Sequence, residues 1–236
     1  SGASGAWVSG PKDLAPAEYF WGYANMCTVK GLFAAGDASG ASSHKFSSGS
    51  HAEGRIAGKS AIEYIVKEKP THKYDQAAID ALKAKILKPM ELFEQYSKET
   101  TDPNINPNYI RPKMFMFRLQ KIMDEYAGGV SAQFKTNKFL LEKGMQLLGF
   151  LKEDSEKLAA ADLHELMRVW ENIHRMWQAE AHVRTILFRE ETRWPGYYFR
   201  ADTPKIDEKW EKFVNLTYDA KEDKWNMFTR DILHIF

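Results

Sequence analysis

The second half of the chain has the spacing of apolar residues that amphipathic helices require. Between residues 113 and 192, apolar positions recur every three or four residues in three successive stretches. Gly128 and Gly129 follow the first stretch as a helix stop, and Asp162 with Glu165 forms an acidic capping box before the third. Three helices joined by short connections predict an antiparallel three-helix bundle.

The first half of the chain predicts a strand, a helix and a connector. Residues 32–35 form a short apolar run typical of a buried strand, and a helix is expected from residues 47–50 to Ile65, closed by Pro70. Residues 76–96 have helical spacing interrupted by Pro89. Residues 100–112 hold three prolines and three asparagines, so we expect a loop at a domain boundary.

Composition narrows the classes of function. The 236 residues carry 33 Lys and Arg against 32 Asp and Glu, so the charge balance gives no case for nucleic acid or membrane surfaces. No apolar run approaches the roughly 20 residues that span a bilayer, and no secretory signal is visible. The single cysteine, Cys27, fits a reduced cytoplasmic compartment and excludes an internal disulfide. An iron–sulfur cluster takes about four cysteines, so another subunit or carrier must exchange electrons in any redox reaction.

Residues 31–59 predict a strand, an acidic residue, a loop of small residues and a helix, in that order. Proteins that hold the flavin end of FAD have the same order of features. Gly36 allows a tight turn and close ligand approach, and Asp37 offers a carboxylate to ribitol hydroxyls. The loop over residues 38–50 is almost all Ala, Ser and Gly, which leaves room for a flat ring. The helix that follows would present N–H groups and a positive dipole to the flavin. An ordinary strand–loop–helix with a serine-rich cap has the same outline.

Other clusters favour structural roles. We expect no metal site, because the histidines of the long helix lack a further ligand at matching spacing: His164, His174 and His182. The segment FREETRW, which contains Arg189, Glu191 and Arg193, is interpreted as ion pairs at a helix end, although catalysis by these groups stays open.

The amino-acid sequences of five segments resemble those of a known family. The run GLFAAGD with HKFSSGSHAEGR resembles the second FAD motif of the fumarate reductase and succinate dehydrogenase flavoprotein superfamily. Within that superfamily it resembles the alpha subunit of dissimilatory adenylylsulfate (APS) reductase, as do residues 7–11, 124–130, 162–175 and 188–202, in the same order. The resemblance covers nearly the whole chain. The chain begins with Ser1 and lacks an upstream GxGxxG motif, so we interpret it as a C-terminal fragment of such a subunit.

The resemblance implies a cofactor site and a reaction. Seven residues are the expected FAD contacts: Gly36, Asp37, His44, Lys45, Phe46, Ser47 and Ser48. His44 would face the flavin or substrate cleft, but the principal substrate residues would lie upstream, so no catalytic residue is expected here. The implied enzyme interconverts adenylylsulfate with AMP and sulfite through a flavin N5–sulfite adduct. Its electrons would come from a ferredoxin-like beta subunit that carries the iron–sulfur clusters.

The predicted fold is an α+β fragment. Residues 1–70 form the C-terminal strand–helix part of an FAD-binding α/β domain, 71–112 a helical connector and loop, 113–192 the three-helix bundle, and 193–236 an irregular tail. Two alternative functions stay open. A fumarate reductase or aspartate oxidase would need an arginine for its dicarboxylate, and none lies between Asp37 and Arg55. Alternatively, residues 113–236 form a helical interaction module in a truncated, inactive chain.

Overall fold

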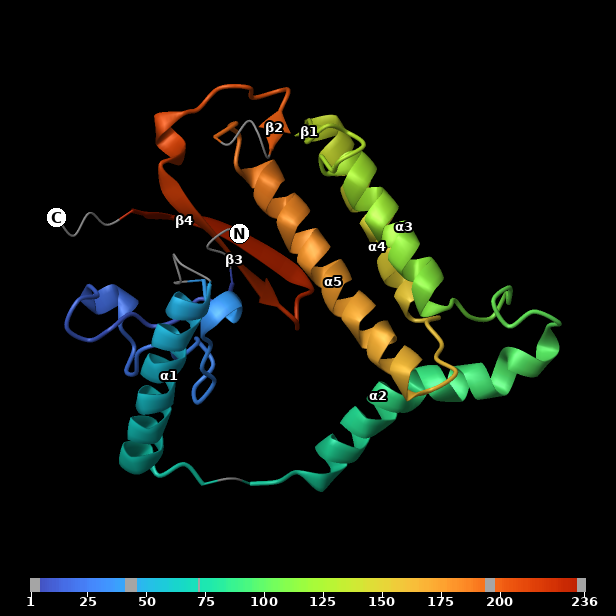
Figure 1. The fold of residues 1–236 in the computed structure, drawn as a ribbon, viewed down its shortest axis with the longest axis horizontal. Helices are drawn as coiled ribbons and strands as arrows, with labels where there is room; N and C mark the ends of the chain where they lie inside the picture. The colour runs from blue at the N-terminus through green and yellow to red at the C-terminus, as the bar shows by residue number, and fades with distance from the viewer. Residues whose placement is uncertain (1–4, 41–45, 72, 194–197, 233–236) are drawn as a thin grey trace. The chain divides into compact units, whose positions relative to one another are not determined.

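The computed structural model describes residues 5–40, 46–71, 73–193 and 198–232 (Figure 1). The chain divides into two compact units, Ser1–Asp75 and Gln76–Phe236. The expected α+β class is confirmed, since helices and small sheets occur together. No helix in the described ranges is both long enough and apolar enough to cross a lipid bilayer.

The first unit combines irregular backbone with one long helix. The 3₁₀ turns η1 (Ala17–Tyr19) and η2 (Gly36–Ala38) precede α1 (Ser47–Glu68). The strand expected over residues 32–35 is reduced to one β-bridge, between Met26 and Phe33, and Leu32 is exposed. A strand needs a ladder of hydrogen bonds to its neighbours, and the described residues of this unit offer only isolated bridges.

Helix α1 begins and ends where the sequence indicates. Phe46 precedes it in an extended conformation, and Lys69 ends it in the left-handed region, with φ of 44°, just before Pro70. Tyr64, on α1, packs edge-on against Tyr23 and Phe33, which ties the preceding loops to the helix. Several apolar side chains of α1 are exposed: Ile56, Ile62, Ile65 and Val66.

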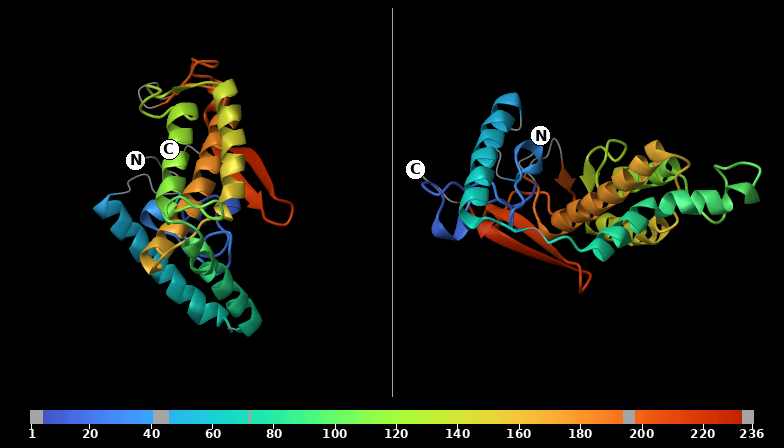
Figure 2. Two further views of the ribbon diagram at one scale, coloured as in Figure 1. Left: turned by 90° about the vertical axis from the view of Figure 1, so that its right-hand side faces the viewer. Right: turned by 90° about the horizontal axis from the view of Figure 1, so that it is seen from below.

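The second unit contains the expected three-helix bundle, formed by α3 (Pro112–Tyr126), α4 (Lys138–Ser155) and α5 (Leu163–Phe188) (Figure 2). The core between them includes fully buried side chains from each helix: Phe115, Leu141, Leu151, Val169 and Val183. The cap of α5 is confirmed. The Asp162 carboxylate accepts the Glu165 N–H at 2.8 Å, while the Glu165 carboxylate accepts the Ala161 N–H at 2.8 Å.

Helix α2 (Gln76–Tyr96) continues through Pro89 and leads to the 3₁₀ turn η3 (Ser97–Glu99). Pro89 is buried, and its carbonyl accepts the Ala160 N–H at 2.9 Å. The Trp170 indole N–H donates to the Ile86 carbonyl at 3.1 Å. These contacts join α2 to the bundle.

The prediction of an irregular tail is wrong. After the 3₁₀ turn η4 (Glu208–Trp210), an antiparallel hairpin pairs β3 (Lys212–Asp219) with β4 (Lys224–Asp231). Its turn uses Asp223 in the left-handed region, with φ of 47°, where glycine or asparagine would have been recognised as a turn signal. A second pair is parallel and only two residues long, between β1 (Lys135–Thr136) and β2 (Phe199–Arg200).

Candidate functional site

The turn at Gly36 favours glycine. Gly36 is buried and has φ of +64°, a conformation that is strained for residues with a side chain. A Cβ added there would lie 3.2 Å from the Ser50 hydroxyl oxygen on α1. The Gly36 N–H donates to the Glu53 carboxylate at 2.7 Å. The turn is therefore held close against the first two turns of α1.

The other end of the turn is held by the chain near its start. The Ala38 carbonyl accepts the Ala6 N–H at 2.8 Å, and the Ala6 carbonyl accepts the Gly40 N–H at 2.8 Å. The backbones approach so closely that a Cβ on Gly5 would lie 2.7 Å from the Ala38 oxygen. Since both ends of the 3₁₀ turn are fixed, the residue between them, Asp37, has a defined backbone position.

The amino end of α1 lies beside this turn. The first hydrogen bond of the helix runs from the Ser50 N–H to the Phe46 carbonyl at 2.9 Å, so the amides before Ser50 are outside the helix's own ladder. Ser47 and Ser48 are exposed in the first turn, and Phe46 is 67% exposed. A polar ring edge and a polyol would use the positive dipole end of a helix and a carboxylate beside it, and Asp37 is an exposed residue next to the amino end of α1.

Five of the seven expected cofactor residues lie in described parts of the chain, and His44 and Lys45 lie outside them. The structure places Gly36 and Asp37 beside the helix that carries Ser47 and Ser48, as the sequence order indicates. Their roles toward a cofactor stay predictions. Sequence reasoning missed Glu53. Its signal was weak: an acid three residues after Ser50, on the same helix face.

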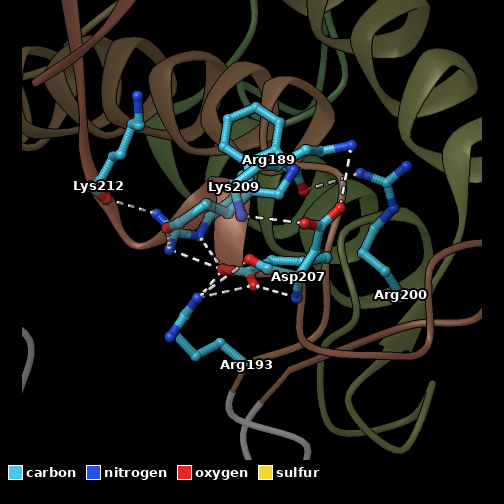
Figure 3. A network of polar contacts seen from close by, with 8 residues as sticks. Arg189, Arg193, Arg200, Asp207, Lys209 and Lys212 are labelled. Carbon is cyan, nitrogen blue, oxygen red and sulfur yellow. Dashed lines mark hydrogen bonds and ion pairs between the residues drawn. The ribbon is translucent and has the colours of Figure 1, made fainter. Parts of the chain in front are cut away.

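A second polar cluster occupies the carboxyl end of α5 (Figure 3). Glu191 is 1% exposed, and its carboxylate accepts hydrogen bonds from Arg189 at 2.8 Å and from Arg193 at 2.8 and 3.0 Å. It also accepts the Asp207 backbone N–H at 3.1 Å. Burial alone would raise the pKa of Glu191, but hydrogen bonds from Arg193, the Asp207 amide and Arg189 lower it overall. The ion pairs expected at this helix end are confirmed.

This cluster braces the segment that follows α5. The Arg189 guanidinium donates to the Trp210 carbonyl at 2.5 Å and to the Lys212 carbonyl at 3.1 Å (Figure 3). The buried Arg200 donates to the Ile186 carbonyl at 2.6 Å. Its cationic neighbours keep Glu191 ionised, so Glu191 is a poor proton donor at neutral pH. Its contacts hold several segments of the chain together, which is a structural role.

Metal ligation has no support in the described part of the chain, where no three histidine, cysteine or acidic side chains are grouped to hold an ion. On α5, His174 instead packs between two tryptophan rings, with centroids 6.3 Å from Trp170 and 5.7 Å from Trp177.

Comparison with known proteins tests the resemblance. No protein-family model matches the chain. The adenylylsulfate reductase alpha subunit of Megalodesulfovibrio gigas is 45% identical over 243 aligned residues, which cover 100% of this chain and 36% of that protein. A solved adenosine-5-phosphosulfate reductase in complex with sulfite, as a covalent adduct, matches 98% of this chain with a TM-score of 0.94 and 54% identity. Over its whole length, the chain is similar to one part of the adenylylsulfate reductase alpha subunit.

The predicted family resemblance is thus confirmed over the whole chain. The chain spans 36% of the M. gigas subunit and 37% of the solved chain with sulfite. The quinol fumarate reductase of E. coli matches 86% of this chain and 34% of its own, with a TM-score of 0.60 and 22% identity. That likeness shows the shared fold.

Proposed function

We propose that this chain is part of a flavoprotein subunit that interconverts adenylylsulfate with AMP and sulfite in dissimilatory sulfur metabolism. The observation that carries the proposal is the match at 54% identity to a solved reductase that holds sulfite. The loop also supports this function over that of a dicarboxylate enzyme. A dicarboxylate enzyme would need an arginine there, and none lies between Asp37 and Arg55.

FAD fits the residues at the proposed site. At Gly36 the φ is positive and a Cβ would lie 3.2 Å from the Ser50 hydroxyl oxygen, so the turn packs tightly beside α1. The Asp37 carboxylate would accept hydrogen bonds from ribitol hydroxyls, while the amides of Ser47 and Ser48 would face the polar edge of the ring. When bound, FAD supplies the two-electron chemistry, and the protein supplies binding and orientation. His44, Lys45 and Phe46 complete the proposed set.

The electrons would come from a partner subunit. Cys27 is the sole cysteine of the chain and is buried, and one thiol cannot hold an iron–sulfur cluster. Following the resemblance, we propose that a ferredoxin-like beta subunit carries the clusters, and a reduced cysteine fits a cytoplasmic location.

The complete subunit, co-expressed with its iron–sulfur partner, tests this function. Sulfite is titrated while the visible flavin absorbance is recorded, with and without AMP. We expect sulfite to lower the oxidised flavin band and AMP to change that response. A band that ignores sulfite and AMP but is lowered by succinate would instead support dicarboxylate chemistry.

A substitution at Asp37 tests the site itself. Asp37→Ala removes the acceptor proposed for ribitol, and a hydrogen bond to a charged group is worth about 1.5–3 kcal/mol, so FAD should bind roughly 10-fold or more weakly. Asp13→Ala is the matched control, because Asp13 is an exposed carboxylate in the same unit. FAD affinity that is the same in both variants would count against the assignment.

A further inference from the structure

The glycine turn of the proposed site is anchored by a side chain outside the residues assigned above. Glu53 lies in the second turn of α1 and is half-buried. Its Oε2 accepts the Gly36 backbone N–H at 2.7 Å, across seventeen residues of sequence. A backbone amide bound to a carboxylate forms a charge-assisted hydrogen bond, which is stronger than an amide–carbonyl pair.

Helix α1 meets the turn at two points on one face. Ser50 and Glu53 are three residues apart, so their side chains are neighbours on the helix surface. The Ser50 hydroxyl limits the space at the Gly36 Cα, and the Glu53 carboxylate holds the Gly36 amide. Together these contacts fix both the distance and the direction of the turn relative to the amino end of α1.

The two ends of the turn are held by different parts of the unit. Glu53 holds the amino end through Gly36, and the Ala6 backbone holds the carboxyl end through Ala38 and Gly40. The Ala6 bonds use only backbone atoms, so they do not depend on the side chain at that position unless proline removes the N–H. Glu53 is therefore the anchor that a side-chain change can remove.

We propose that Glu53 is a positioning residue for the FAD site. It holds the Gly36–Ala38 turn against α1, so that the Asp37 carboxylate meets the ribitol while the helix amides meet the ring. Glu53 acts through the backbone of Gly36 and does not itself touch the cofactor. This inference rests on the proposed function, because it assumes that FAD binds at this turn.

Two substitutions at one position test the idea in the complete subunit with its partner. Glu53→Ala removes the acceptor, whereas Glu53→Gln keeps an oxygen that can accept the Gly36 N–H. The apoprotein is titrated with FAD, and the dissociation constant is read from quenching of flavin fluorescence. We expect roughly 10-fold weaker binding for Glu53→Ala, about 1.4 kcal/mol, and a change within about threefold for Glu53→Gln. Glu63→Gln is the matched control, because it removes a carboxylate from the same helix, where Glu63 pairs with the exposed Lys67.

The outcomes separate this inference from the proposed function. If the wild-type subunit takes up no FAD, the proposed function fails. If it takes up FAD and Glu53→Ala binds it with wild-type affinity, only the positioning role fails. Thermal unfolding of the apoproteins is the second readout. Equal FAD affinities for the Ala and Gln variants, with a shared fall in apoprotein melting temperature, would assign Glu53 a purely structural role and overturn the inference.

Discussion

Replacing Glu191 tests the reasoning about the second unit most directly. Its carboxylate is fully buried between Arg189 and Arg193, and it also holds the Asp207 amide. Glu191→Ala would leave two guanidinium groups, whose side chains are only 23% and 26% exposed, without their anion. It would also leave one backbone N–H unpaired.

The magnitude follows from these contacts. Removing one member of a buried ion pair costs about 3–5 kcal/mol, because the remaining charge is left poorly solvated. At about 2–4 °C per kcal/mol for a unit of this size, the melting temperature should fall by roughly 10 °C. Glu191→Gln should fall in between, since the amide keeps one acceptor oxygen but turns an N–H₂ group toward the arginines.

Thermal unfolding followed by circular dichroism, with guanidinium denaturation as a check, measures the effect. Glu190→Gln is the control, because Glu190 is the exposed neighbour and surface changes usually stay within about 0.5 kcal/mol. The pH dependence adds a second test. The pKa of Glu191 is lowered in the folded state from an ordinary 4.5, so its stabilisation is present above that value and is lost as pH falls through the folded pKa. The structural role of Glu191 would be refuted if Glu191→Ala melted within 2 °C of wild type and lost stability at low pH in the same way as wild type.

Three further pairs of substitutions have expected outcomes in urea unfolding. Asp162→Ala removes the cap of α5 and should cost about 1 kcal/mol, with Asp162→Asn close to wild type; equal losses would contradict the capping role. Gly36→Ala should destabilise by about 1–2 kcal/mol through its positive φ, whereas Gly58→Ala, in open space on α1, should stabilise by roughly 0.5–1 kcal/mol. Leu141→Ala should cost about 2–5 kcal/mol at a fully buried site, and Leu163→Ala, at a 70% exposed one, should cost far less.

Features set by local rules were predicted well from the sequence. The bundle helices follow from apolar spacing, and the cap at Asp162 lies within four residues of the group it binds. The ion pairs around Glu191 also join near neighbours, so the segment suggested them correctly. The glycine turn beside a serine-rich helix start was likewise readable from residue order.

Features that depend on distant partners were missed. The hydrogen bonds of the Glu191 cluster to Asp207 and Trp210 form only because the chain after α5 folds back onto the cluster. The hairpin of β3 and β4 was hidden because Asp223 takes the position where glycine would mark a turn. The Glu53 contact to Gly36 joins residues on either side of a loop, so sequence spacing did not reveal it. The strand expected before that loop has only an isolated bridge in the first unit, so the apolar run alone gave the wrong element.

The single cysteine has a practical consequence. Cys27 is buried in the first unit, and burial raises the pKa of its thiol, so it reacts slowly while that unit is closed. Because the chain has no other thiol, the labelling rate of Cys27 under native conditions reports how often the first unit opens, separately from the unfolding of the helical bundle. Comparing that rate with and without FAD in a subunit carrying this thiol alone would show whether the cofactor closes the first unit, without any measurement of catalysis.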